Sequence, residues 1–258
     1  MSLRLVLACA STALILGACA APSFDVQPRY SRPAISGRAG ATSGGVGGSA
    51  DLERAGLDQD EAISLRADLD FGSPRLVGLA DAPEFAGDGT IDVTVSDGTN
   101  TIAAGTPVSS ELNLAHYDLA LVFDLVPGDT IDLGIGFGAA YLDLDFRFED
   151  TGTGTVVASH EQAPVPILAA TAGVWIGPVE LSAFGGGVQY KQNDDDLTFL
   201  DLDAYARLKL FGGASRLRAS LVGGYRYTDF KLDYTDDSSD IDADFTIQGP
   251  YVGLEVRL

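Results

Sequence analysis

The sequence predicts an all-β protein, a small antiparallel transmembrane β-barrel of about ten strands, with about eight strands as the alternative. Three observations favour this fold. Apolar and polar residues alternate with a period of two along most of the chain, tight turns alternate with longer polar breaks, and a secretion signal begins the sequence. No apolar run of about 18 residues or more follows the N-terminus, which argues against a bundle of transmembrane helices.

Residues 1–18 have the composition of a bacterial secretion signal. A short positive start that includes Arg4 precedes an apolar run, and small residues follow it. Residues 16–19 read Leu-Gly-Ala-Cys, which matches the lipobox of bacterial lipoproteins, so we expect cleavage before Cys19 and lipidation of its thiol. Cleavage after Ala20 is the alternative, because the residues around it also fit the small-x-small pattern of ordinary signals.

Residues 19–50 are expected to form a flexible N-terminal segment with a candidate first strand over residues 24–36. Two prolines inside this strand weaken the prediction, because proline cannot donate to a hydrogen-bonded ladder. Residues 37–49 are rich in Gly and Ser, which is typical of a loop or linker. The barrel itself is predicted over residues 51–258.

The strand prediction depends on side-chain alternation. Over residues 131–138 every odd position is Ile, Leu or Phe, and every even position is Asp or Gly. Successive side chains of a strand point to opposite faces, so one face is apolar and the other is small or polar. In residues 129–149 and 215–234 the apolar set changes parity part-way, which indicates either a bulge or the emergence of the strand from the bilayer.

Turns determine the predicted topology. Short periplasmic turns and longer external loops are expected of an outer-membrane barrel, and closure into a ring removes sheet edges that lipid does not tolerate. A soluble β-sandwich is the structural alternative, although its strands are usually shorter. Tight breaks lie near residues 72–74, 126–129, 176–178 and 211–214, and longer polar breaks at 97–110, 149–163, 193–196 and 235–242. The predicted hairpins cover residues 62–95, 112–148, 164–192 and 197–234, with a last strand over 243–258.

The C-terminus carries an assembly motif. Tyr251, Gly253, Val256 and Leu258 occupy the positions of the β-signal by which the outer-membrane assembly machinery recognises a last strand. The usual terminal aromatic residue is replaced by Leu258. The alternation places the apolar side chains of this strand toward lipid and Gly253 toward the lumen.

Composition narrows the function classes. The chain has 258 residues, which allows one large domain or two small ones, and 16 Lys and Arg against 37 Asp and Glu give a net charge of −21. Nucleic acid is not expected as a partner, because phosphate backbones require clusters of basic residues. The two cysteines cannot build a disulfide framework or a four-cysteine zinc site, and no cofactor is expected.

The tail over residues 224–254, with Gly224-Tyr-Arg226 and Gly249-Pro-Tyr251, resembles an uncharacterised family of Gram-negative outer-membrane β-barrel proteins. Residues 112–119 and 132–134 are similar to its central strands. The resemblance covers residues 50–258 and implies a small barrel without an established activity. The lipobox departs from the ordinary signals of many such barrels.

His116 and Asp118 are the candidates for a catalytic pair. They lie two positions apart in a predicted strand and share its inward face, where the carboxylate could orient the imidazole. Ser182 or Ser220 on another strand would have to supply the nucleophile. The alternative, which we favour, is an inward polar pair that fills the lumen, so no enzymatic activity is expected. His160 is expected in a loop without a partner.

Acidic residues suggest two further roles. Asp236, Asp240 and Asp242 are candidate ligands of Ca²⁺ or Mg²⁺, because hard cations prefer carboxylate oxygens, but solvated loop acids are the default interpretation and no metal is expected. Inside the barrel, acids and bases are expected to pair and to fill a narrow lumen. The expected acids are Asp118, Asp124, Asp132, Asp201 and Asp203, and the bases are Arg207, Lys209, Arg218 and Arg226.

These features predict an outer-membrane β-barrel with a structural or surface-interaction role. A narrow channel for small solutes is the first alternative, and a lipid-modifying enzyme that uses His116 is the second. The expected partners are outer-membrane lipids, lipopolysaccharide and, during insertion, the barrel assembly machinery. The protein is expected to be a monomer.

Overall fold

The structure is a computed structural model that describes residues 22–43, 46–126, 130–192, 195–211, 217–235 and 239–258. The predicted secretion signal and Cys19 lie outside these residues. Within the described part of the chain, no helix is long and apolar enough to cross a membrane.

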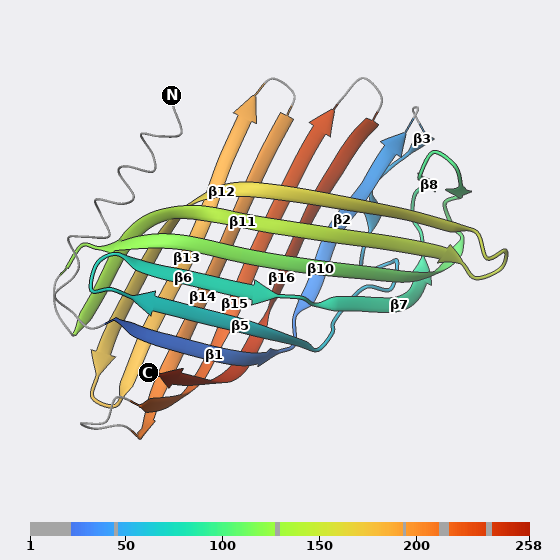
Figure 1. Cartoon of the computed structure of the whole chain (residues 1–258). Coiled ribbons are helices and arrows are strands. Elements are labelled where there is room, and N and C mark those ends of the chain that lie inside the picture. The colour runs from blue at the N-terminus through green and yellow to red at the C-terminus, as the bar shows by residue number, and fades with distance from the viewer. Residues whose placement is uncertain (1–21, 44–45, 127–129, 193–194, 212–216, 236–238) are drawn as a thin grey trace.

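The protein is one closed barrel of ten antiparallel wall positions (Figure 1). Each position, which we call a stave, is occupied by one strand or by two consecutive strands. Two staves consist of two strands in line: β1 (Ser23–Ser31) with β2 (Ala34–Ser43), and β6 (Arg75–Asp81) with β7 (Glu84–Thr90). The other staves are β5 (Ala62–Asp70), β10 (Pro107–Asp124), β11 (Ile131–Asp150), β12 (Val156–Ile176), β13 (Val179–Gln192), β14 (Asp195–Phe211), β15 (Arg218–Thr235) and β16 (Ser239–Arg257). Short strands β3 (Val46–Gly47) and β4 (Ala50–Asp51) pair with β2, and β8 (Val95–Ser96) pairs with β9 (Thr101–Ile102).

The first and last staves close the ring. β1 pairs with the C-terminal part of β16, from Asp25 opposite Arg257 to Ser31 opposite Tyr251. β2 pairs with the N-terminal part of the same strand. The prediction of about ten strands is confirmed, and the sandwich alternative is wrong, because the wall is one continuous ring of paired strands.

Prolines divide the two composite staves. Pro33 separates β1 from β2, and Pro83 separates β6 from β7. Proline lacks the backbone N–H that a ladder needs and restricts the residue before it, so each stave is interrupted at its proline. Both breaks flank the short strand β5. Residues 52–58 fill the wall above β5, where the amide of Ile35 donates to the carbonyl of Asp58 at 2.8 Å and that of Thr90 donates to Arg54 at 2.8 Å.

The Gly-rich N-terminal segment belongs to the barrel wall. The predicted loop over residues 37–49 is wrong for residues 37–43, because β2 continues through Ser43 and pairs with β16. Gly37 has φ of 118°, and a Cβ there would lie 2.3 Å from the carbonyl oxygen of Asp244. Glycine therefore permits the close approach of β2 to β16. The segment has the composition of a flexible linker, but residues 37–43 form a paired strand.

Two of the predicted long loops are mostly strand. β11 ends at Asp150 and β12 begins at Val156, so the predicted loop over residues 149–163 is reduced to a short turn. β16 likewise begins at Ser239. A membrane-spanning strand needs about 9–11 residues, whereas β11 has 20 and β12 has 21. About half of each strand therefore extends beyond the bilayer.

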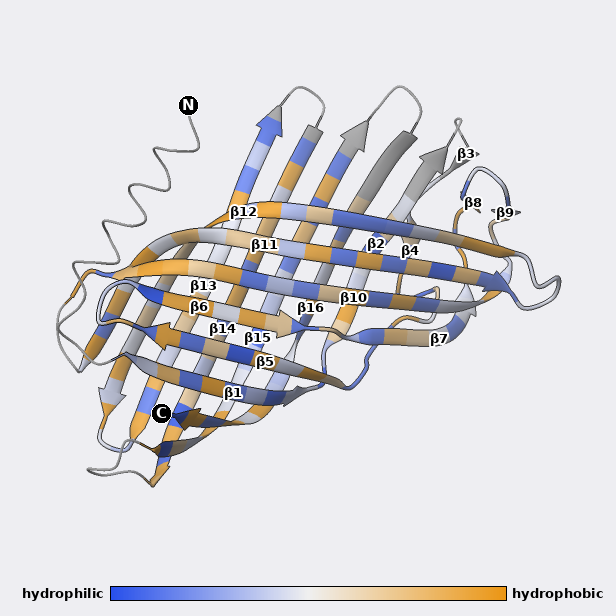
Figure 2. Cartoon of the chain, in the orientation of Figure 1, coloured by the Kyte–Doolittle hydropathy of each residue, from blue (hydrophilic) through white to orange (hydrophobic). Residues whose placement is uncertain are grey.

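The barrel consists of two halves in which the apolar side chains point in opposite directions. Apolar and polar residues alternate along the strands of both halves (Figure 2). We call the half that ends in turns 71–74 and 177–178 the membrane half, and the half that ends at loops 91–106 and 151–155 the outer half. In the membrane half the apolar side chains face outward, as shown by Ile63 and Leu168, which are 76% and 74% exposed. In the outer half the apolar side chains face the lumen and are buried. They include Ile35, Leu57, Phe85, Leu112, Leu142, Phe199, Phe230 and Phe245.

The change of parity in the sequence is this inversion of polarity. β10 and β11 pair without a register shift from Val108 opposite Asp150 to Asp124 opposite Gly134. β15 and β16 also pair continuously. Emergence of the strands from the bilayer is therefore correct, and the bulge alternative is wrong for these two strand pairs.

Candidate functional site

The lumen of the membrane half is filled by ion pairs, which we call the plug. Its uppermost member is Arg226 on β15. The guanidinium donates to Asp201 at 2.9 Å and to Asp81 at 3.1 Å, and it lies 3.4 Å from Asp118. Strands from several sides of the barrel supply these carboxylates, so one cation joins opposite walls.

A second layer centres on Asp203, whose side chain is fully buried. Arg29 donates to its Oδ2 at 2.8 Å, Arg66 donates to the same oxygen at 3.3 Å, and the Tyr251 hydroxyl donates to Oδ1 at 2.5 Å. The Arg29 guanidinium also lies 4.4 Å from the centre of the Tyr251 ring. This layer brings together β1, β5, β14 and β16.

A third layer lies nearer the short turns. Arg207 donates to Glu255 at 2.7 Å and lies 3.4 Å from Glu180, and the Gln27 amide also donates to Glu255, at 2.6 Å. Burying an ion is costly unless it is paired and hydrogen-bonded, and each ion of these three layers has such a partner. The plug therefore fills the middle of the membrane half with side chains, and a polar cavity lies between it and the short turns.

Inward acids and bases pair with one another as predicted, but only some of the observed partners are the predicted ones. Asp118 and Asp201 pair with Arg226 as expected. Arg29, Arg66 and Arg75 are partners that the sequence analysis missed. Asp124 and Asp132 pair with Arg75. The ammonium group of Lys209 lies 4.8 Å from the centre of the Trp175 ring. Arg218 lines a polar cavity at the end with the short turns.

His116 lies at the top of the plug and points inward, as predicted. Its Nε2 is 2.9 Å from Asp118 Oδ1, and its Nδ1 is 3.0 Å from Nη2 of Arg226. Arg226 can only donate, so Nδ1 accepts and Nε2–H donates to Asp118, which describes a neutral imidazole with both nitrogens used. No hydrogen bond among the described residues joins a hydroxyl to His116. The hydroxyl of Ser182 instead donates to Glu180 at 2.6 Å.

The imidazole and carboxylates of the same cluster surround the guanidinium of Arg226. His116, Asp118 and Asp201 have ligand atoms within 4.8 Å of one another. The guanidinium of Arg226 contacts all three side chains and supplies the positive charge that a cation would bring. The acids Asp240 and Asp242 lie on β16, but their side chains, and all of Asp236, lie outside what the structure describes.

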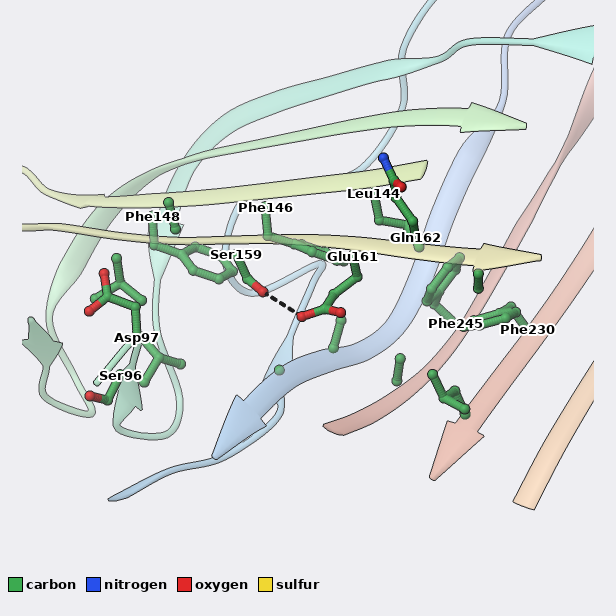
Figure 3. Close-up of a pocket in the computed structure, with 18 residues that line it drawn as sticks. Ser96, Asp97, Leu144, Phe146, Phe148, Ser159, Glu161, Gln162, Phe230 and Phe245 are labelled. Atoms are coloured by element: carbon green, nitrogen blue, oxygen red, sulfur yellow. Dashed lines mark hydrogen bonds between the residues drawn. The ribbon is translucent and has the colours of Figure 1, made fainter. Parts of the chain in front are cut away.

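Above the plug, the outer half encloses an apolar cavity of about 240 Å³, which we call the chamber (Figure 3). Its floor is the buried cluster around Leu112, Leu142 and Phe199, which separates it from the plug. Phe230 and Phe245 form one wall, with ring centres 5.3 Å apart. The other lining residues are Ala39, Gly40, Val95, Ser96, Asp97, Leu144, Phe146, Phe148, Val157, Ala158, Ser159, Glu161, Gln162, Ala163, Leu232 and Ala243.

Two acidic residues border this lining: Glu161 is half-buried, whereas Asp97 is exposed. Glu161 on β12 accepts a hydrogen bond from the Ser159 hydroxyl at 3.2 Å. Asp97 accepts from the backbone amides of Asn100 at 2.7 Å and Thr99 at 2.8 Å. These two backbone hydrogen bonds hold the pKa of Asp97 below its ordinary value, so its carboxylate is ionised at neutral pH.

A scan against protein-family models found no match, and a search of curated protein sequences found none either. Among solved structures, the chain is similar to the outer membrane protease OmpT from Escherichia coli, with 11% identity, a TM-score of 0.56, and coverage of 91% of this chain and 97% of that chain. It is also similar to the translocator domain of autotransporter NalP from Neisseria meningitidis, with 15% identity and a TM-score of 0.47, over 97% of this chain and 94% of that chain. Ail, the attachment invasion locus protein of Yersinia pestis, matches with 10% identity and a TM-score of 0.36, over 93% of this chain and all 100% of that chain.

The likeness to OmpT shows the fold, and the outward-facing apolar side chains of the membrane half show that lipid surrounds it. The chain is an outer-membrane β-barrel protein. The comparisons support no narrower family, so the resemblance of residues 224–254 to one family remains a prediction.

The residues of the assembly motif have clear structural roles in this outer-membrane barrel. Val256 and Leu258 are exposed on the apolar belt, as predicted, whereas Tyr251 is buried in the plug. Gly253 faces β1, where a Cβ would lie 2.6 Å from the carbonyl oxygen of Pro28. Gly253 is thus needed for barrel closure itself, and recognition by the assembly machinery remains a prediction.

The prediction for His160 is wrong. It lies within β12, where its Nδ1 is 2.7 Å from Asp145 and 3.4 Å from Asp143 on the neighbouring strand. Because the connection between β11 and β12 is shorter than predicted, His160 lies on a paired strand rather than in a loop. The chamber was also missed, although its signal was present: the apolar residues after the change of parity, Leu144, Phe146, Phe148, Phe230 and Leu232, all line it.

Proposed function

We propose that this outer-membrane barrel has a surface-interaction role and that it binds a small apolar ligand in the chamber. The observation that carries the proposal is the inverted polarity of the outer half, which places an apolar lumen outside the membrane. Water is a poor solvent for such a lining, so transfer of an apolar group into the chamber is favourable. The plug beneath it supports binding rather than passage through the barrel.

A binding experiment tests this proposal. The purified barrel in lipid nanodiscs is titrated with 4-phenylbutanol, a neutral molecule with one aromatic ring, and binding is measured by isothermal titration calorimetry against empty nanodiscs. Ala163→Phe, which fills the chamber, should remove saturable binding. Ala115→Phe is the matched control, because this residue lies on the outward parity of β10 between the inward Leu114 and His116. Equal binding by the two variants, each shown to be folded by heat-modifiable gel mobility, contradicts the proposal.

A narrow channel is the alternative that the plug opposes. Planar bilayers loaded with the purified barrel should show no conductance steps above background. Regular steps, which Arg226→Ala enlarges, would instead support a channel through the plug. Catalysis with His116 as a base is likewise disfavoured, since both of its nitrogens are engaged, and His116→Ala should leave lipid A and phospholipid profiles unchanged.

We also propose that the membrane half is anchored and assembled as the sequence predicts. β1 begins at Ser23 beside the C-terminus, where the amide of Phe24 donates to the carbonyl of Leu258, on the rim with the short turns. Lipid on Cys19 would therefore enter the leaflet next to that rim. Mass spectrometry of the mature protein should show an acylated N-terminal cysteine, and Cys19→Ala should remove the acyl mass. A mature chain that begins at Ala21 would contradict lipidation.

The remaining proposed partners follow from the two surfaces. The apolar belt contacts outer-membrane lipids, the polar outer half lies among lipopolysaccharide head groups, and the closed ring functions as a monomer. Light scattering of nanodiscs, with the lipid mass subtracted, should give one chain per disc.

A further inference from the structure

The charges that line the chamber all have one sign. Its charged side chains among the described residues are Asp97 and Glu161, and the described lining contains no Lys, Arg or His. Arg147 and His160 point the other way, since both are exposed and pair with acids on the outer surface of the wall. Arg38 and Lys231, which lie next to lining residues on their strands, are also exposed, and Arg38 pairs with Asp92. An anionic ligand would meet repulsion here without a compensating partner.

We infer that the ligand of the chamber is an amphipathic cation, a small apolar body that carries an amine or quaternary ammonium group. This inference rests on the proposed function, because it specifies the chemistry of the same chamber. The cation would lie against Glu161, and the apolar body would lie against the phenylalanine rings.

Glu161 differs from the carboxylates of the plug. Asp201, Asp203 and Glu255 each have an arginine partner. Glu161 has the Ser159 hydroxyl on Oε1, and no ion pair among the described residues includes it. Its position on the inward face of β12 points the carboxylate into the chamber, as Figure 3 shows. A carboxylate in a partly apolar site that lacks a cation of its own is a suitable counter-charge for a bound ammonium group.

The aromatic lining fits the same ligand. Phe146, Phe148, Phe230 and Phe245 present rings to the chamber, and the faces of aromatic rings attract cations. The rings also provide the apolar contact that the ligand body needs. One carboxylate with several aromatic rings is therefore more selective for an alkylammonium ion than for a neutral molecule of the same shape.

Cavity size limits the ligand body. The chamber has about 240 Å³, whereas an apolar protein cavity of about 150 Å³ takes up benzene. One aromatic ring with a short chain therefore fits. A body of two or more fused rings exceeds this volume unless the mouth of the chamber opens.

Three probes with one apolar body test the inference in nanodiscs: 4-phenylbutylamine, 4-phenylbutanol and 4-phenylbutyrate, each measured by isothermal titration calorimetry. The amine should bind at least tenfold more tightly than the alcohol, and the carboxylate should bind most weakly. The advantage of the amine should fall as salt is added, because screening weakens the attraction between the two charges.

Glu161→Gln should lower the affinity for the amine to that for the alcohol and leave the affinity for the alcohol unchanged. Glu111→Gln is the matched control, since this carboxylate is exposed on the outer surface. Equal binding of all three probes by the native barrel, or an amine preference that Glu161→Gln does not reduce, overturns the inference while the proposed function stands. Absence of saturable binding by all three probes overturns both.

Discussion

The two halves of this barrel use the same strands with opposite polarity. In the membrane half the large apolar side chains face out and the charges face in, whereas in the outer half the apolar side chains face in. The backbone ladder does not change between them, because β10 and β11 keep one register along their whole length. The comparison shows that the surrounding solvent, lipid or water, determines which face of a strand is apolar.

The plug provides the largest test of this comparison. Asp203→Ala leaves Arg29 and Arg66 without their shared carboxylate, and removing one partner from a buried ion pair typically costs about 3–5 kcal/mol. Glu111→Ala, which removes an exposed partner 4.0 Å from Arg147, should cost at most about 1 kcal/mol. Urea unfolding of the barrel in lipid vesicles measures both. Similar losses for the two variants would show that the plug is solvated.

Leucines on opposite faces sharpen the contrast. Leu142 faces the lumen of the outer half and is 1% exposed, so Leu142→Ala should cost about 2–5 kcal/mol through lost packing and a cavity. Leu168 faces lipid, and Leu168→Ala leaves no cavity because acyl chains fill the space, so its cost should be limited to the lost transfer free energy, about 2 kcal/mol at about 0.8 kcal/mol per carbon removed. The same urea titrations compare them. A larger loss for Leu168→Ala would mean that the halves have been assigned the wrong way round.

Arginine scanning maps the boundary between the halves. Phe137→Arg places a charge on the apolar belt and should cost about 2–4 kcal/mol near the bilayer midplane. Asn113→Arg lies on the outward face of the outer half and should be close to neutral. Vesicle unfolding or folding yield serves as the readout. A cost for Asn113→Arg equal to that for Phe137→Arg would place both positions in lipid.

The smallest expected effect is a pH dependence in the outer half. The hydrogen bond with Asp145 raises the pKa of His160, so the charged imidazole favours the folded state. This stabilisation should be fully present below pH of about 6.5, the ordinary value, and should be lost as pH rises through the raised folded value. NMR titration of His160 measures its pKa directly, and His160→Gln should remove this contribution from the pH dependence of unfolding. A folded pKa at or below the ordinary value would contradict the pairing.

The sequence predicted the barrel because alternation and turns are local signals. The period of two over residues 131–138 located a membrane strand, and the tight breaks near residues 72–74 and 176–178 located two of the short turns, while the other two breaks lie largely outside the described residues. The predicted inward positions of His116 and Asp118 are confirmed for the same reason, since parity along one strand determines the face.

What the sequence did not predict depends on contacts across the ring. Arg29 and Arg66 lie more than 130 residues from Asp203, and only the register of every intervening strand brings them together. The chamber was missed because the apolar residues after the change of parity were considered strand by strand. Inward apolar residues from several strands together line the chamber.

The proline breaks that flank β5 leave part of the outer half without a long ladder, because beside β2 and β7 the wall is completed by residues 52–58 through separate backbone hydrogen bonds. A second such place lies between β12 and β13, which pair only from Leu168 opposite Gly187 to Ile176 opposite Val179, so that within the described chain residues 156–167 pair on one side only. Amide protons that face these two places should exchange with solvent sooner than those of the membrane-half ladders. The outer half can therefore open locally while the strands within the bilayer keep their pairing.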